Sequence, residues 1–96
     1  MAIPGSGRTF NLSVISPERK VFEGPAKFLV VPAFDGELGV LPGHAPLMAL
    51  LGQGTLKIVT ETGTRRFDVS GGFVQVKDDV VSVLSEEAEE SVASGR

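Results

Sequence analysis

Short runs with strand character follow one another along this chain, and all but the last are closed within a few residues by glycine, proline or aspartate. Several of them alternate apolar and polar residues, which is the pattern of a strand with one face on a core. The runs span residues 10–14, 20–23, 27–31, 46–51, 55–60, 64–70, 73–77 and 80–84. The run 46–51 is also compatible with a buried helix, but its brevity favours a strand. No run up to residue 85 has a 3.6-residue period, so the spacing predicts an all-β sandwich or barrel.

The segments between the runs carry turn residues. Ser16-Pro17-Glu18-Arg19 and Asp35-Gly36 have the composition of tight turns. Hairpins are predicted across Glu61-Thr62-Gly63 and across Asp78-Asp79. Gly71-Gly72 interrupts the pattern, and its simplest interpretation is a bend or a site where two backbones approach closely.

Composition limits what a chain of 96 residues can do. The length predicts one domain, and the absence of cysteine excludes disulfides and thiolate metal sites. Residues 1–85 carry eight Lys/Arg and eight Asp/Glu, so the predicted folded part has no net charge. Nucleic-acid binding would require a basic excess, and we therefore expect no nucleic-acid partner. The longest apolar runs are far too short to span a bilayer.

The two ends of the chain differ from its middle. Residues 1–9 lack the apolar segment of a signal peptide and are expected to be flexible. The β-sandwich domain is predicted over residues 10–85. Residues 86–96 contain four glutamates and no apolar stripe, which predicts an acidic tail that is frayed or disordered.

The segment from Gly36 to Pro46 is unusually rich in residues with special backbone properties. It contains three glycines, two prolines and the only histidine of the chain. Such density predicts a shaped loop that holds Glu37 and His44 in fixed places. Phe34, beside this loop, is a candidate contact residue. The other five phenylalanines are predicted to lie in the core, namely Phe10, Phe22, Phe28, Phe67 and Phe73.

The sequence lacks the local signatures of common catalytic sites. There is no nucleophile elbow, no phosphate-binding glycine loop and no His-Glu-x-x-His segment. With one histidine and no cysteine, a zinc site would depend mostly on carboxylates, so no metal or cofactor is expected. Two alternatives stay open: a small-molecule-binding β-domain with the Gly36–Pro46 loop as its lid, and a hydrolase that uses His44 with Glu37 or Asp35.

Four segments in this order are similar to one known family, the epsilon subunits of F-type ATP synthases, which are called delta in mitochondria. They are Val14–Gly24, Val30–Pro32, Gly36–Leu47 and Val69–Val76. The resemblance runs from about Phe10 to Glu87. It implies a flattened β-sandwich of two five-stranded sheets, in agreement with the strands expected from periodicity.

The resemblance also implies a place and partners. Members of this family lie at the foot of the rotating central stalk, where they bind the gamma subunit and sit on the polar loops of the c-ring. The implied role is non-catalytic: it couples proton-driven rotation of the c-ring to ATP synthesis elsewhere in the F1Fo complex. The implied location is peripheral, on the cytoplasmic face of the bacterial plasma membrane or an equivalent membrane, with membrane contact only through the c-ring.

By position, the resemblance assigns contact residues. Asp35, Glu37 and His44 fall where the family faces the c-ring, and Ser16, His44 and Ala49 fall where it meets gamma. The alternatives are that Ser16 simply caps its own turn, that Asp35 serves the turn before Gly36, and that Ala49 lies in the core.

Many members of the family continue into a C-terminal hairpin of two helices that inhibits ATP hydrolysis and in some members binds ATP. The present sequence stops at Arg96. If that is the natural length, the resemblance predicts a subunit without this inhibitory device. A naturally short subunit and a truncated one are both compatible with the sequence.

Overall fold

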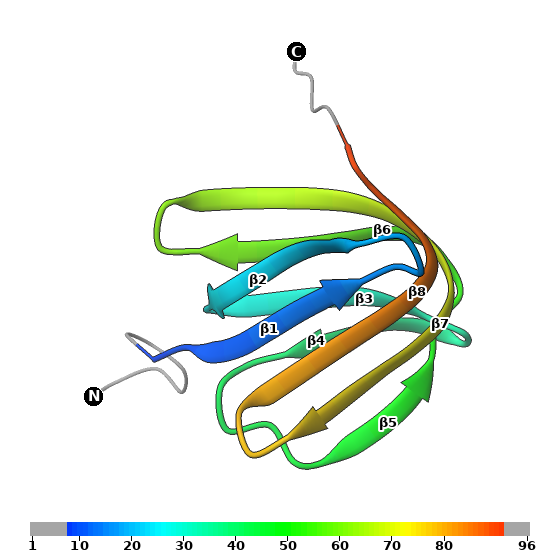
Figure 1. The fold of residues 1–96 in the computed structure, drawn as a ribbon. Coiled ribbons are helices and arrows are strands. Elements are labelled where there is room, and N and C mark those ends of the chain that lie inside the picture. Colours follow the sequence, from blue (N-terminus) through cyan, green and yellow to red (C-terminus); the bar gives the residue numbers. More distant parts are fainter. Residues whose placement is uncertain (1–7, 92–96) are drawn as a thin grey trace.

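The computed structural model of the chain describes residues 8–91, which form eight strands and no helix (Figure 1). The strands are β1 (Phe10–Ile15), β2 (Lys20–Ala26), β3 (Phe28–Ala33), β4 (Gly36–Val40), β5 (Leu47–Leu50), β6 (Gln53–Thr60), β7 (Gly63–Lys77) and β8 (Val80–Glu90). Within these residues there is consequently no helix of the length and apolarity needed to cross a membrane. The two predicted hairpins are confirmed as β6–β7 and β7–β8.

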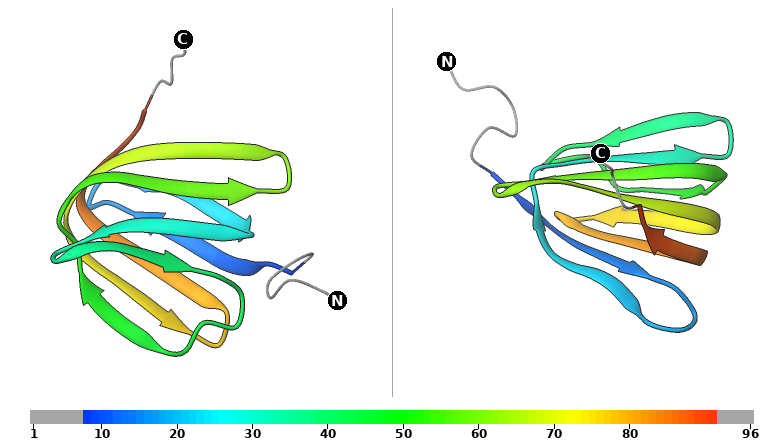
Figure 2. Two further views of the ribbon diagram at one scale, coloured as in Figure 1. Left: turned by 180° about the vertical axis from the view of Figure 1, so that it is seen from behind. Right: turned by 90° about the horizontal axis from the view of Figure 1, so that it is seen from above.

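The strands form one sheet that folds over onto itself. Their order is β2-β1-β8-β7-β6-β3-β4, with β5 also paired to β7, and only the β1–β8 pair is parallel. The long strands β7 and β8 bend and pass through both halves of the fold (Figure 2). Layer one therefore contains β2, β1, the first part of β8, the second part of β7, and β5. Layer two contains the second part of β8, the first part of β7, β6, β3 and β4. Five strand segments cross each layer, and the predicted β-sandwich is confirmed.

The bend in β7 lies at Gly71-Gly72. Gly72 has a φ of +104°, and a Cβ atom placed there would lie 1.8 Å from the carbonyl oxygen of Leu84 on β8. No side chain fits in that space, so the close backbone approach predicted from the glycine pair is confirmed. The glycine pair does not end the strand, because β7 remains paired with β8 on both sides of the bend.

The core lies between the layers and is built from inward-facing aliphatic and aromatic side chains. In β7 the buried residues are Phe67 and Val69 before the bend and Val74 and Val76 after it. The change from odd to even numbering means that the bend turns the strand so that each half keeps one face on the core. Three of the five phenylalanines predicted to be buried are in the core, and the other two, Phe28 and Phe73, are only half-buried.

Part of the segment predicted as a shaped loop is a strand. Residues 36–40 form β4, which pairs with β3 and points Leu38 and Val40 towards the core. The alternation was obscured because the strand begins with Gly36, and Gly39 rather than a polar residue occupies one of its two outward positions, the other being Glu37. The remaining loop, 41–46, begins with a tight turn in which the His44 N–H donates to the Leu41 carbonyl at 3.1 Å. Gly43, at the third position of that turn, has a φ of +84°.

The expectation of a frayed tail from residue 86 is wrong for residues 86–90. They continue β8 and pair with β7, and Ala88 is buried opposite Val69. Main-chain hydrogen bonds to a neighbouring strand, rather than an apolar stripe, order this segment. The remainder of the predicted acidic tail, residues 92–96, and most of the predicted flexible N-terminus, residues 1–7, lie outside the described residues.

Glu90, at the end of β8, is held by Arg65. The guanidinium donates two hydrogen bonds to the carboxylate, at 2.8 and 2.9 Å, and also lies over the rings of Phe22 and Phe67 at 5.3 and 5.4 Å. The hydrogen bond from Arg65 lowers the pKa of the Glu90 carboxyl, and the same bond raises the pKa of Arg65. These contacts join β2, β7 and the end of β8.

Candidate functional site

Of the three residues assigned to the c-ring, Asp35 and Glu37 lie together and His44 lies apart from them. Asp35 is in the β3–β4 turn and Glu37 follows it on β4, and both are exposed. His44 comes after the other end of β4, and four residue steps of about 3.3 Å along that strand separate its ends by roughly 13 Å. Instead of a carboxylate, the Nδ1 atom of His44 has the carbonyl of Ala45 as its partner, at 2.7 Å. The acid–base pair that the hydrolase hypothesis requires is therefore not formed.

The loop that carries His44 is fastened to the β7–β8 turn. The Gly43 N–H donates to Asp79 Oδ1 at 2.6 Å, and the other carboxylate oxygen of Asp79 lies 3.5 Å from the guanidinium of Arg8. Asp78 and Asp79 have φ angles of 54° and 61°, as a two-residue hairpin turn of the I′ type requires. Sequence reasoning identified this turn but not its contact with residue 43, which lies 36 positions away.

Ser16 and Ala49, assigned to gamma, lie at opposite sides of layer one. The Ser16 N–H and hydroxyl both donate to the Arg19 carbonyl, at 2.9 and 3.2 Å, so Ser16 does cap its own turn. Ala49 pairs with Val74 and packs against the core with its side chain half-buried. Within the chain itself, Ser16 therefore caps its own turn and Ala49 packs against the core, as the two alternatives stated.

An apolar row on the outer face of layer one connects these two positions. Register pairs place Leu50 beside Phe73, Phe73 beside Leu84, and Leu84 beside Ile15; these four residues are called the apolar row. Ile15 directly precedes Ser16, and Leu50 directly follows Ala49. Leu50 is 64% exposed and Leu84 37% exposed. The sequence signal that was missed is consecutive apolar residues within short strands, because such runs place apolar side chains on both faces.

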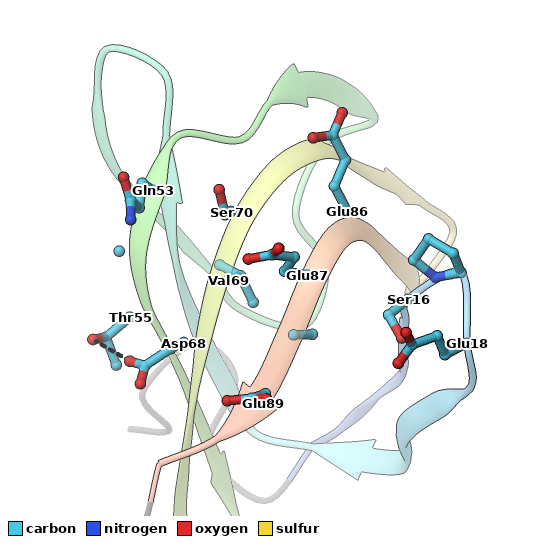
Figure 3. A pocket seen from close by; sticks show the side chains of 13 residues that line it. Ser16, Glu18, Gln53, Thr55, Asp68, Val69, Ser70, Glu86, Glu87 and Glu89 are labelled. Carbon is cyan, nitrogen blue, oxygen red and sulfur yellow. Dashed lines mark hydrogen bonds between the residues drawn. The ribbon is translucent and has the colours of Figure 1, made fainter.

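The outer face of layer two is polar and hollowed where β6, β7 and β8 cross it. A hollow of about 590 Å³ lies over β6, β7 and β8 beside the Ser16–Glu18 turn (Figure 3). Its lining includes five carboxylates, those of Glu18, Asp68, Glu86, Glu87 and Glu89. Among residues 8–91 no three acidic or histidine side chains converge as metal ligands would. No residue from 36–46 lines this hollow, so the lid of the small-molecule hypothesis is not positioned over it.

Comparison with known proteins identifies the family. Residues 9–91 match the family described as the beta-sandwich domain of the ATP synthase Delta/Epsilon chain. The chain belongs to this family. The resemblance inferred from the four sequence segments is thereby confirmed over nearly the whole described part.

Individual members of the ATP synthase delta/epsilon family agree with this assignment. The chain is 46% identical over 84 residues to the ATP synthase epsilon chain of Pelotomaculum thermopropionicum, covering 88% of this chain and 63% of that one. It is 50% identical over 72 residues to the epsilon chain of Rhodopirellula baltica, covering 75% and 56%. The chain thus spans about three fifths of the length of these curated relatives.

Solved structures show the same fold. A chain in the Euglena gracilis mitochondrial ATP synthase, determined as OSCP, F1 and c-ring, superimposes with a TM-score of 0.80 at 28% identity, covering 94% of this chain and 56% of that one. A chain in the central stalk and c-ring of the Tetrahymena thermophila enzyme superimposes with a TM-score of 0.72 over 82% of this chain and 64% of that one. At 15% identity the second likeness concerns the fold alone.

Proposed function

We propose that this chain is a central-stalk subunit of a proton-translocating F-type ATP synthase. In this role it binds the gamma subunit, seats on the polar loops of the c-ring, and couples rotation of the c-ring to ATP synthesis in the F1Fo complex. The observation that carries the proposal is family membership over residues 9–91, supported by the fold shared with a chain of the Euglena F1 and c-ring assembly. The chain contributes structure rather than catalytic groups, and it reaches the membrane only through the c-ring.

The c-ring contact is assigned to the exposed hairpin at Asp35 and Glu37. Carboxylates on an edge strand are suited to charge-assisted hydrogen bonds with arginine on the c-ring loops. His44 lies beyond the other end of β4, so it joins this contact only if the contact follows the length of that strand, and it otherwise belongs to the gamma side. The proposed location is peripheral, on the cytoplasmic face of the bacterial plasma membrane or its equivalent.

The gamma contact is assigned to the region of Ser16 and Ala49. Both residues have internal roles, so we assign the contact to the surface around them rather than to their side chains alone. The Ala49 end of this surface adjoins the Asp35–Glu37 hairpin, because the Phe34 N–H donates to the Leu50 carbonyl at 2.9 Å, so the two proposed contacts are neighbours.

The decisive experiment is reconstitution with the gamma subunit and c-ring of the same source. The full chain should bind gamma stably, and the Glu37→Lys variant should bind gamma normally but weaken the coupling of proton flow to ATP synthesis. Because Glu37 is exposed, its replacement should leave the melting temperature almost unchanged. Failure of the wild-type chain to bind a folded gamma subunit would refute the proposal.

A further inference from the structure

The second central residue of the β7–β8 turn is an aspartate where the turn favours glycine. In a type I′ turn both central residues have a positive φ, and glycine is preferred at the second of them. That position is occupied by Asp79, at a φ of 61°. Glycine adopts this conformation at a lower cost than any residue with a Cβ. The turn by itself therefore does not account for a side chain at position 79, and the contacts of the carboxylate do.

Asp79 joins three segments that lie far from it in the sequence. Its main-chain carbonyl accepts from the Asn11 N–H at 2.9 Å, near the start of β1. Its Oδ1 atom accepts from the Gly43 N–H at 2.6 Å, and its Oδ2 atom lies 3.5 Å from the guanidinium of Arg8. One residue thus ties the beginning of β1, the loop 41–46 and Arg8 to the β7–β8 turn.

The bond to Gly43 is the contact that holds the loop. A hydrogen bond from a main-chain N–H to an ionised carboxylate is stronger than one between neutral groups. The guanidinium of Arg8 lies alongside, since a Cβ placed on Gly43 would be 3.8 Å from Arg8 Nη1. The side chains of Arg8 and Asp79 are 60% and 39% exposed, and an ion pair between such exposed groups contributes little. The hydrogen bond rather than the ion pair is therefore the fastening.

Gly43 directly precedes His44, so the fastening acts on the main chain from which the imidazole projects. The His44 N–H donates to the Leu41 carbonyl at 3.1 Å, and the imidazole Nδ1 has the Ala45 carbonyl as its partner at 2.7 Å. These two contacts shape the loop internally. Only the bond to Asp79 ties residues 43 and 44 to another element of the sandwich among the hydrogen bonds of the described residues.

We propose that Asp79 is a positioning residue for His44, because its carboxylate holds the loop 41–46 in the conformation that presents the imidazole to gamma. This inference rests on the proposed function and adds a residue that acts through His44. The loop leads directly into β5, which contains Ala49, whereas β4 separates His44 from Glu37 by roughly 13 Å. His44 is therefore assigned to the gamma contact rather than to the c-ring contact.

The size of the effect follows from the population of the binding-competent loop. When only a fraction of the molecules has the competent conformation, the apparent Kd rises by the reciprocal of that fraction. A hydrogen bond to a charged group shifts a conformational equilibrium by roughly 10- to 100-fold. The turn bond from His44 to Leu41 does not involve Asp79, so the lower end of this range applies and affinity should fall about 10-fold.

The test compares glycine substitutions at the two central positions of one turn. Asp79→Gly removes the acceptor for the Gly43 N–H while suiting the turn, and Asp78→Gly removes a carboxylate from the same turn but leaves that acceptor in place. Affinity for the cognate gamma subunit is measured by calorimetry with the full chain, after circular dichroism has shown each variant to be folded.

Asp79→Gly should bind gamma about 10-fold more weakly, at a melting temperature within a few degrees of wild type. Asp78→Gly should bind like wild type, and so should Arg8→Gln, which removes only the exposed ion pair. Asp79→Asn keeps an acceptor oxygen and should recover most of the affinity. Asparagine binding as weakly as glycine at position 79 would overturn the inference.

A double-mutant cycle tests whether Asp79 acts through His44. In the His44→Ala background, Asp79→Gly should change the affinity for gamma by less than about 2-fold, because the side chain that the loop presents is already gone. A structural defect at the turn would weaken binding whatever residue stands at position 44. Independent, additive losses from the two substitutions would therefore overturn the inference.

A measurement on the wild-type chain applies even if Asp79→Gly fails to fold. The Gly43 amide should exchange with solvent at least about 10-fold more slowly than in an unfolded peptide of the same sequence, because its hydrogen is held by Asp79. Exchange at the rate of the unfolded peptide would show that the loop is not fastened, and would overturn the inference.

The outcomes separate the two proposals. If the wild-type chain does not bind gamma, the proposed function fails and this inference fails with it. If wild type binds gamma and Asp79→Gly binds equally well, the function stands and the inference is overturned. Equal weakening by Asp78→Gly also overturns it, because the charge or shape of the turn would then be responsible. Weaker seating on the c-ring with unchanged affinity for gamma would overturn the assignment of His44 to gamma.

Discussion

Replacement of Gly72 by alanine should be the most damaging single-methyl change in this chain. An ideal Cβ at this position would lie 1.8 Å from the Leu84 carbonyl oxygen and 2.8 Å from its carbonyl carbon. Both atoms are main chain of β8, which is paired with β7 on either side of the bend. To reach even 3.0 Å, the distance below which Cβ contacts essentially never occur, the two strands would have to separate by roughly 1.2 Å at the point where both layers are joined.

The cost follows from what this separation breaks. Two or three ladder hydrogen bonds at about 1 kcal/mol each are strained or lost. A positive φ at a residue with a Cβ adds about 1–2 kcal/mol. The expected loss is about 4 kcal/mol or more, out of a total stability of roughly 5–14 kcal/mol for a chain of this length. Gly72→Ala should therefore melt far below wild type or not fold.

Gly71→Ala is the matched control. Gly71 also has a positive φ, +69°, but the three atoms nearest to its Cβ would all belong to the side chain of Glu86, which is exposed and can move aside. Gly71→Ala should lose only the free energy of holding a residue with a Cβ at a positive φ. This loss is about 1–2 kcal/mol and lowers the melting temperature by roughly 4–16 °C. Because the chain has no Trp or Tyr, melting is followed by far-ultraviolet circular dichroism. Melting temperatures within a few degrees of each other for the two variants would refute the close-approach argument.

Three further predictions concern the ends and turns of the sandwich. The lowered pKa of Glu90 means that its ion pair with Arg65 stabilises the fold above the unfolded-state pKa of about 4.3 and that this contribution is lost as the pH falls through the folded-state value. Glu90→Gln should remove at most about 1 kcal/mol at pH 7 and nothing at pH 2, because the pair is solvent-exposed; an equal loss at both pH values in urea titrations would contradict this. Asp79→Ala should lower stability by about 1–3 kcal/mol, since the acceptor for the Gly43 N–H disappears, whereas Asp79→Asn should retain most of it; identical melting of the two variants would show that the hydrogen bond is unimportant. Gly43→Val places a β-branched residue at a φ of +84° and should cost about 2 kcal/mol or more, so an unchanged melting temperature would rule out the turn assigned here.

Much of this fold could be predicted from the sequence because strands and tight turns have local signatures. Alternation identified both faces of β1 and β6, and the turn residues placed the hairpins at 61–62 and 78–79. Segment resemblance identified the family for the same reason, since it depends on the order and spacing of residues along the chain. Where Gly39 stands in place of a polar residue on the outward face of β4, the local signature failed and a strand was taken for a loop.

Only the tertiary structure decided which strands pair and what their pairing brings together. Nothing local to residues 86–90 predicts a strand, because their order comes from hydrogen bonds to β7. The hydrogen bond between Gly43 and Asp79 likewise depends on how distant segments are placed side by side. So does the apolar row from Leu50 to Ile15. The sequence by itself determined the family and the elements other than β4 and the end of β8. The contact surfaces arose from non-local pairing, which one-dimensional periodicity does not encode.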